Sequence, residues 1–247
     1  MRPYIIVVAS LILFSSDAKP SRSQQPLNNQ GFSLHFPRTI DTTSLEIRYF
    51  LGGEFGGYGG FVRTNPETWD YTIETSYEGK PARSLKAIVF CPGYEMKLLD
   101  IPSLDDSAAK SIDLELRPLK LIQLSGRVIL PEADSKLSLR IDARYEAYWD
   151  HEFFGIADGF VSSFDLASTA LSEDGSFSMM VPDFAHDPAV NSFKDRGAIQ
   201  LTTRDPKTGN LTNWLERSKS GDDAKLGVDI QSVEQYRELI LYARPNR

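Results

Sequence analysis

The chain has 247 residues, of which 41% are hydrophobic and 11% aromatic, and its formal net charge at pH 7 is -7. This composition excludes a disordered chain, because disorder requires low hydrophobicity. The acidic balance argues against nucleic acid as a partner, because a nucleic-acid-binding face must offset the charge of the phosphates. The single cysteine, Cys91, excludes an internal disulfide; it lies in the apolar run "KAIVFC", which predicts a buried side chain.

The first 18 residues have the features of a signal peptide. Arg2 gives a basic start, residues 4–14 are apolar, and the small residues Ser16 and Ala18 stand where a signal peptidase cleaves. The apolar run is too short to span a bilayer as a helix, so cleavage is favoured over an N-terminal anchor. We expect cleavage near Ala18, no membrane span in the mature chain, and a disordered leader over residues 19–31, which are polar and contain two prolines.

The predicted signal peptide and the single cysteine together limit the source and the cellular compartment that fit this chain. Small secreted animal domains usually carry several disulfides, whereas this chain has none. The sequence therefore predicts a bacterial protein that is secreted or periplasmic.

Alternation of apolar and polar residues with a period of two dominates the chain after residue 31. In residues 137–147, for example, Ile141 and Tyr145 share one face while Asp142 and Arg144 share the other. This pattern predicts half-buried strands, because successive side chains of a strand point to opposite faces. The clearest segments are 45–51, 69–75, 111–116 and 137–147. Helical spacing is limited to residues 211–219 and 231–239, each of which predicts a short helix.

The number of short strands and the turn residues between them indicate an all-β fold. Such spacing is typical of antiparallel sandwiches and not of a parallel α/β sheet. A proline, Pro118, separates two strand-like segments and marks a crossing between modules. We therefore predict two tandem antiparallel β-sandwich modules of prealbumin-like or Ig-like type with little helix, over residues 32–118 and, with insertions, 119–247.

The segment "LGGEFGGYGGFVR" (residues 51–63) contains six glycines and three aromatic residues. Its glycine spacing fits neither the dinucleotide-binding fingerprint nor the phosphate-binding loop, and a turn and a strand follow it in place of a helix. The glycines permit bends and bulges, so we interpret the segment as an excursion between two strands. Tyr58 is a candidate ligand-binding residue if its ring faces solvent. The favoured alternative is that the ring points into the core and has only a structural role.

Two segments of the second half, residues 121–134 and 169–182, resemble segments of a known protein family. Ser125–Val128, Pro131 and Asp174–Phe177 resemble the opening strand, the turn and the Asp-Gly-x-Phe step of the carboxypeptidase regulatory-like, or prealbumin-like (transthyretin-like), β-sandwich family. The resemblance implies tandem modules that serve as accessory domains in secreted and cell-surface proteins. Related sandwiches include starch-binding-like domains, so it also implies a carbohydrate-binding-like fold by analogy.

The residues of catalytic and metal chemistry do not form a recognisable motif. His35, His151 and His186 are far apart, and the carboxylates that flank His151 would face away from it on a strand. No Gly-x-Ser-x-Gly elbow occurs, and Cys91 has no histidine nearby in sequence. We expect no catalytic residue, no metal and no cofactor, although a catalytic site assembled from distant residues stays an alternative.

The segment "YEAYWDHEFF" (residues 145–154) concentrates aromatic side chains among polar ones. Aromatic rings bind sugars because the C–H faces of a sugar are apolar, and an exposed cluster of this kind would form a binding patch. Burial in the core is the favoured alternative, because an alternating strand buries every second residue. The candidate ligand-binding residues are Tyr58, Tyr148, Trp149, His151 and Phe154.

Three functions follow from these observations. The first is an exported, non-catalytic β-sandwich protein that acts as a binding or structural accessory module in the periplasm or at the cell surface. The second is a carbohydrate-binding module that uses exposed aromatic residues, and the third is a hydrolase with a site between the two modules. The expected partner is a polysaccharide or another protein of the cell envelope.

Overall fold

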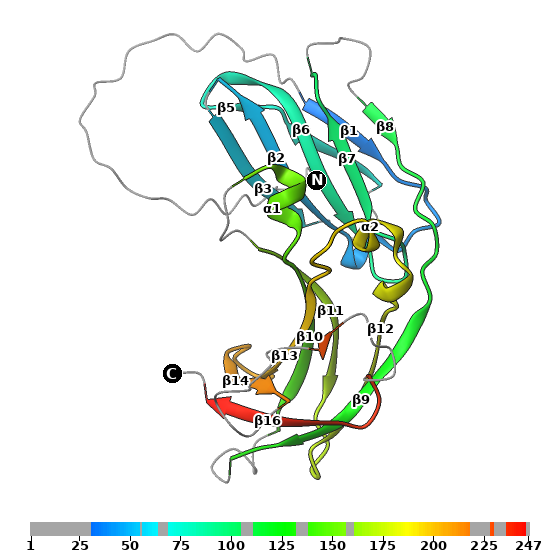
Figure 1. Cartoon of the computed structure of the whole chain (residues 1–247), viewed down its shortest axis with the longest axis vertical. Helices are drawn as coiled ribbons and strands as arrows, with labels where there is room; N and C mark the ends of the chain where they lie inside the picture. Colours follow the sequence, from blue (N-terminus) through cyan, green and yellow to red (C-terminus); the bar gives the residue numbers. More distant parts are fainter. Residues whose placement is uncertain are drawn as a thin grey trace, which may run out of the picture.

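A computed structural model (Figure 1) describes residues 31–54, 56–63, 69–104, 111–131, 138–156, 161–217, 228–229 and 236–245. The predicted signal peptide and all but the last residue of the predicted leader lie outside these ranges. The strands are β1 (Gly31–His35), β2 (Glu46–Gly53), β3 (Gly56–Arg63), β4 (Asp70–Glu74), β5 (Ser76–Tyr77), β6 (Lys80–Phe90), β7 (Lys97–Ile101), β8 (Ser111–Asp113), β9 (Leu121–Ile129), β10 (Arg140–Ala147), β11 (Ser162–Ala170), β12 (Ser176–Pro182), β13 (Ala198–Arg204), β14 (Leu211–Glu216), β15 (Val228–Asp229) and β16 (Leu239–Pro245). The helices are α1 (Asp150–Phe154) and α2 (Pro188–Asn191), with 3₁₀ turns at Thr42–Ser44 and Phe184–His186.

The all-β prediction is confirmed, because strands dominate the described residues and both α-helices are short. Most ladders are antiparallel, while β1 pairs with β8 and β9 pairs with β16 in parallel. The helix predicted over residues 211–219 is wrong, since β14 runs through it with Leu215 buried and Trp214 exposed. The second predicted helix, 231–239, lies largely outside the described residues. Neither described helix has the length and apolar character that crossing a membrane requires.

The first unit is a sandwich of two sheets. One sheet has the order β4-β1-β8, and the other has the order β3-β2-β6-β5 with β7 paired to β6. Alternate residues of the strands fill the space between the sheets, as the period-two pattern predicts. Its core includes Phe32, Leu34, Ile47, Leu51, Tyr71, Ile73, Leu85, Ala87 and Val89.

The second unit is a single eight-stranded sheet curled around its own core. The strand order is β11-β10-β13-β14-β16-β9-β12, and β15 pairs with β13. The two end strands, β11 and β12, are consecutive in the chain and approach each other, which closes the sheet around the core. Figure 1 shows the two units arranged along the long axis of a crescent, with β5 at one end and the β11–β12 connection near the other.

Strand β6 supplies side chains to both cores. Leu85, Ala87 and Val89 lie in the core of the first unit, whereas Ile88 and Phe90 face the other way and lie in the core of the second. Phe90 packs against Phe164 of β11 at 5.1 Å between ring centroids. The second face of this sheet is therefore covered by the second unit and not by solvent. The predicted boundary at Pro118 stays a prediction, and the shared core indicates that neither unit buries its apolar surface alone.

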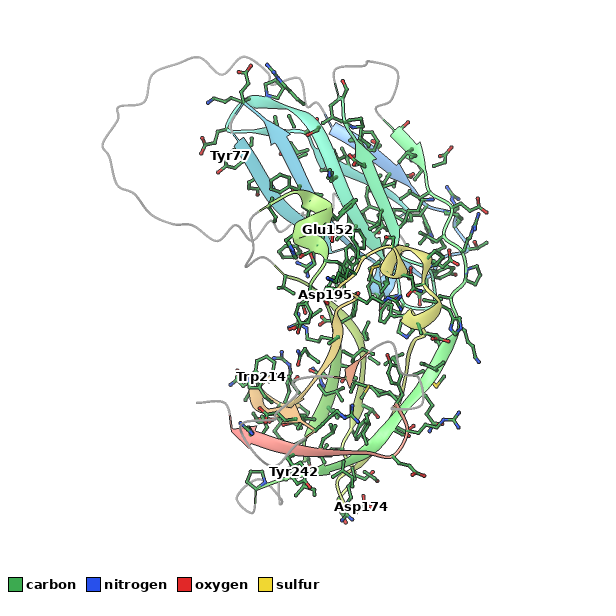
Figure 2. All side chains as sticks on the ribbon, viewed as in Figure 1. Tyr77, Glu152, Asp174, Asp195, Trp214 and Tyr242 are labelled. Atoms are coloured by element: carbon green, nitrogen blue, oxygen red, sulfur yellow. The ribbon has the colours of Figure 1, made fainter. Side chains whose placement is uncertain are left out.

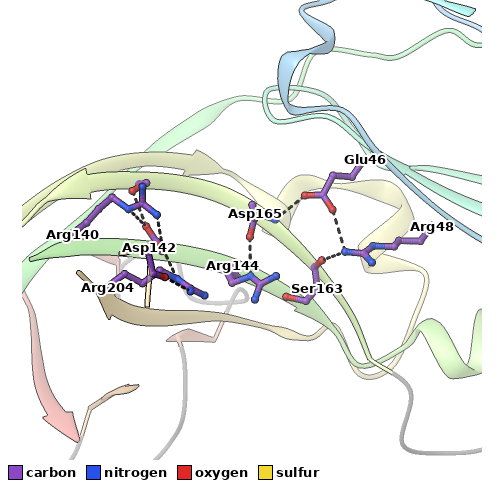
Figure 3. Close-up of polar contacts among 10 residues, drawn as sticks. Glu46, Arg48, Arg140, Asp142, Arg144, Ser163, Asp165 and Arg204 are labelled. Carbon is purple, nitrogen blue, oxygen red and sulfur yellow. Dashed lines mark hydrogen bonds and ion pairs between the residues drawn. The ribbon is translucent and has the colours of Figure 1, made fainter. Parts of the chain in front are cut away.

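Two polar residues of β2 continue this contact. The alternation in residues 45–51 predicts that Glu46 and Arg48 lie on the polar face of the strand, yet Glu46 is buried, at 7% exposure. Arg48 Nη2 donates to the carbonyl of Ser163 at 2.7 Å, and Glu46 Oε1 accepts from the amide of Asp165 at 3.3 Å. Arg48 and Glu46 also pair with each other at 3.1 Å. Figure 3 shows these contacts joining β2 to β11.

The glycine-rich segment forms the β2–β3 hairpin, as the strand-to-strand interpretation predicts. Gly52 and Gly53 of β2 face Gly57 and Gly56 of β3 in an antiparallel register. A Cβ atom on Gly57 would lie 2.1 Å from the ring of Phe50, because that ring lies across the neighbouring strand. Gly57 and Gly60 therefore make room for the aromatic side chains of Phe50 and Tyr49.

Candidate functional site

The predicted aromatic cluster divides between core and surface. Trp149 is completely buried and stacks on Phe193 with 4.5 Å between the ring centroids. Its Nε1 donates to the hydroxyl of Tyr145, which in turn donates to the carbonyl of Arg196. Phe154 is also buried and packs against Phe50 of the first unit. Trp149 and Phe154 present no face to a ligand in this structure, in agreement with the favoured alternative of core packing.

Tyr148 and His151 are half-buried, and Tyr148 belongs to a polar network. The Tyr148 hydroxyl donates to Glu146 at 2.9 Å and accepts from Gln200 at 3.1 Å. Burial raises the pKa of Tyr148, and its bond to Glu146 raises the pKa further. His151 lies on α1, which ends at Gly155 in the left-handed conformation. The ligand-binding roles of Tyr148 and His151 stay predictions.

Tyr58 lies on β3 and packs against the core of the first unit, whereas Trp149 and Phe154 lie in the core of the second. It is half-buried and stacks on Tyr77 of β5 with 4.4 Å between ring centroids. Figure 2 places Tyr77 at the end of the molecule opposite to Asp174. Tyr58 packs on a different core from the cluster of residues 145–154, and its role in binding stays a separate prediction.

The outer face of the second sheet carries an exposed group of side chains that the sequence did not indicate. Trp214 of β14, Tyr242 and Ile240 of β16 and Ile129 of β9 lie on this face, and we call them the aromatic strip. Trp214 is 38% exposed, Ile129 46% and Ile240 57%. The strand register makes them neighbours. Tyr242 lies opposite Ile129, and it is two residues along β16 from Arg244, which lies opposite Trp214. Figure 2 shows Trp214 and Tyr242 in the lower half of the crescent.

Ion pairs lie beside the strip on the same face. Asp142 of β10 receives both Arg140 Nε and Arg204 Nε at 2.9 Å. Arg244, directly opposite Trp214 in the ladder, pairs with Glu216. The carboxylates are nearly buried and the guanidinium groups more exposed, with side chains 8% exposed for Glu216 and 40% for Arg244. Figure 3 shows the Arg140–Asp142–Arg204 cluster and the neighbouring Arg144–Asp165 pair.

Beneath these ion pairs lie two polar side chains with unused hydrogen-bonding atoms. Thr202 and Gln200 of β13 are 2% and 5% exposed and share the outer face with Trp214. In the part of the chain that the structure describes, Thr202 Oγ1 and Gln200 Oε1 have no hydrogen-bond partner. Buried polar atoms are normally satisfied, so a bound internal water is the expected partner of these two atoms.

The junction between the units contains a cleft of about 440 Å³. It lies between the start of β7, the connection through Glu115 and Arg117, and helix α2. Asp187, next to the cleft, is completely buried and accepts hydrogen bonds from the amides of Met96, Ala189 and Val190. This carboxylate ties α2 to the first unit, so its hydrogen bonds are structural.

Asp187 gives the junction a defined pH dependence. Burial raises its pKa above the ordinary value of 3.8, in spite of the three amide donors. The folded state therefore holds this proton more tightly than the unfolded state, and the resulting stability is present below pH 3.8 and lost as pH rises through the raised pKa. We expect the unfolding free energy of the wild type, relative to Asp187→Asn, to fall over that window in urea titrations at stepped pH. A difference that rises with pH would contradict the sign of the shift.

The remaining titratable groups offer little further chemistry. Burial raises the pKa of the Cys91 thiol to about 11, so the thiol is protonated at neutral pH. The three histidines lie on separate elements, and His35 and His186 pair with Asp70 and Asp183. Within the described ranges, no three His, Cys, Asp or Glu side chains converge in the manner of a metal site.

The two segments that carry the family resemblance pair with each other. Arg127 lies opposite Ser176 in the β9–β12 ladder, and Arg127 Nε donates to the carbonyl of Asp174. Gly175 has a φ of +82°, and a Cβ atom there would lie 2.3 Å from the carbonyl oxygen of Val128. These residues therefore encode a strand pair and its turn, and they lie outside the aromatic strip.

Comparisons with known proteins give little similarity. No family model matches the chain, and no curated protein matches it. Among solved structures, a candidate adhesin of Bacteroides ovatus is 8% identical over 79% of this chain and 86% of that one, with a TM-score of 0.26. The shaft pilin SpaA of Lactobacillus rhamnosus GG is 9% identical over 88% of this chain and 98% of that one, with a TM-score of 0.23. We base no functional inference on similarities this low.

Proposed function

We propose that this chain is an exported, non-catalytic binding module of the periplasm or the cell surface, which holds its partner on the outer face of the second sheet. The observation that carries the proposal is the aromatic strip of Trp214, Tyr242, Ile240 and Ile129. Contiguous apolar side chains on a soluble protein mark interaction surfaces more often than chance exposure does. The strip lies on the outer face of a sheet whose inner face is packed against the core of the second unit.

Two classes of partner fit this face, namely a polysaccharide and another protein of the cell envelope. The polysaccharide is favoured by the fixed ion pairs beside Trp214, because sugar hydroxyls need both donors and acceptors near an apolar ring. A structural role without a ligand is the weaker version of the proposal, since it leaves the exposed strip without a purpose. The carboxypeptidase regulatory-like resemblance supports an accessory module of this kind.

A hydrolase with a site between the units is the third candidate. The cleft at the junction favours it, because two glutamates, Glu95 and Glu115, line it together with Lys97 and Arg117. The nearest buried carboxylate, Asp187, is already engaged by three backbone amides. We therefore rank the binding module above the hydrolase.

Retention on a cell-envelope fraction tests the proposal. We expect the mature protein to sediment with the envelope of its source organism, and the double variant Ile129→Ser/Ile240→Ser to bind at least about tenfold more weakly, through loss of buried apolar area. The matched control is Leu121→Ser/Met180→Ser, which changes two equally exposed side chains of the same sheet outside the strip.

Treating the envelope before the assay separates the two partner classes. Periodate destroys polysaccharide and protease destroys protein, so the treatment that abolishes retention names the class. No retention by the wild type, or equal retention by the strip variant, would overturn the binding module. Mass spectrometry of the exported protein checks cleavage near Ala18, and an uncleaved N-terminus would contradict the predicted signal peptide.

A further inference from the structure

We propose that the Trp214 end of the aromatic strip binds an acidic sugar unit, that is, a pyranose ring that carries a carboxylate. This inference rests on the proposed function and names the ligand class of the same face. Four observations support the inference. They are the exposed indole of Trp214, Arg244 directly opposite it in the ladder, three guanidinium groups that share two carboxylates, and two buried polar atoms without a hydrogen-bond partner among the described residues.

Trp214 supplies the apolar platform. Its neighbours across the two ladders are Thr202 on β13 and Arg244 on β16, so the indole lies between a small side chain and a guanidinium group. With 38% of its surface exposed, the indole is the most accessible of the three tryptophans that the structure describes. A pyranose has an apolar C–H face, which packs on an aromatic ring while the hydroxyl groups stay at the rim.

Arg244 supplies the group that would recognise a carboxylate. Glu216 pairs with Arg244 from below, with only 8% of the Glu216 side chain exposed. The pair engages the Nε of Arg244, and 40% of the Arg244 side chain stays exposed. A fixed guanidinium binds carboxylates in a bidentate manner, and the orientation that Glu216 provides removes part of the entropic cost.

Charge around Trp214 favours an anionic ligand over a neutral one. Arg140 and Arg204 share the single carboxylate of Asp142, and Arg244 pairs with Glu216. Arg140, Arg204 and Arg244 thus share two carboxylates, on a chain whose formal net charge is -7. A guanidinium group beside the indole that is only partly neutralised by its carboxylate favours an anionic ligand over a neutral one.

The atoms beneath the indole would complete the site. Thr202 Oγ1 and Gln200 Oε1 are buried, lie on the same face and have no hydrogen-bond partner within the described residues. Because both atoms are buried, a sugar hydroxyl group would reach them through a bridging water.

Calorimetric titration of the full mature protein with two matched trisaccharides tests the inference. We expect the trimer of galacturonic acid to bind at least about tenfold more tightly than maltotriose, and added salt to weaken only the acidic ligand. Trp214→Ala should weaken both ligands at least about tenfold, whereas Arg244→Gln should remove the preference and leave the weaker, neutral binding. Arg244→Lys, which keeps the charge and loses the bidentate fork, should restore the preference in part.

Met180→Ala is the matched control, since it removes an exposed apolar side chain from the same sheet outside the strip. Urea unfolding of each variant confirms that the fold is kept. Equal affinity for the two trisaccharides, no binding of either, or unchanged binding by Arg244→Gln or Trp214→Ala would overturn the acidic-sugar site. Each of these results leaves the envelope-retention experiment unaffected, so the binding module can stand while the sugar class fails.

Discussion

Replacing Trp149 with alanine is expected to lower the free energy of unfolding by about 3–5 kcal/mol, the usual cost of removing a large aromatic side chain from a core. The side chain is completely buried, stacks on Phe193 and donates a hydrogen bond to Tyr145. The substitution leaves a cavity and removes one partner of the buried Tyr145 hydroxyl. Urea denaturation followed by circular dichroism measures the loss.

Trp214→Ala is the matched control for that substitution. Trp214 is exposed on the outer face of β14, so its removal should change the unfolding free energy by less than about 1 kcal/mol. The two variants are expected to separate the roles of the two tryptophans, with Trp149 acting on stability and Trp214 on binding. Similar losses of stability in both variants would contradict the division between core and surface.

Replacing Phe90 with alanine is expected to destabilise the second unit, although Phe90 belongs to a strand of the first. The ring is completely buried between Phe164 and Phe184, so the cost is about 3–5 kcal/mol. Hydrogen exchange followed by mass spectrometry should show faster exchange of the β11 amides. Leu99→Ala, in the core of the first unit, is the control and should affect β11 less. Unchanged exchange in β11 would show that the two cores are independent.

The sequence predicted the features that depend only on the alternation of apolar and polar residues within a single strand. The pattern of residues 137–147 gave β10 with the correct faces, because Ile141, Ala143 and Tyr145 are buried while Asp142 and Arg144 are partly exposed. The β2 pattern gave the strand and its apolar face. It did not give the burial of Glu46, because the partner of Glu46 lies 119 residues later in β11.

The candidate site was missed for a related reason. Residues 211–219 have helix-compatible spacing, and that interpretation placed Trp214 on a helix. In the fold, β14 lies between β13 and β16, and pairing with both neighbours outweighs the local preference. Alternation around Trp214, with Asn213 and Leu215 buried on either side, was the signal that could have identified the strand. No local pattern could have placed Arg244 beside it, because the β14–β16 register comes from the tertiary fold.

The contacts of Glu46 and Arg48 with β11 also bear on how this protein avoids association with copies of itself. β11 ends its sheet, and the carbonyl of Ser163 and the amide of Asp165 point to the same side of the strand because they are two residues apart. An open row of such groups is a template on which another chain can pair, and long unprotected edges lead to aggregation. Here a carboxylate and a guanidinium occupy that row in place of a strand. The contact that joins the two units therefore also covers a strand edge on which another chain could pair, and this protection depends on the first unit staying in place.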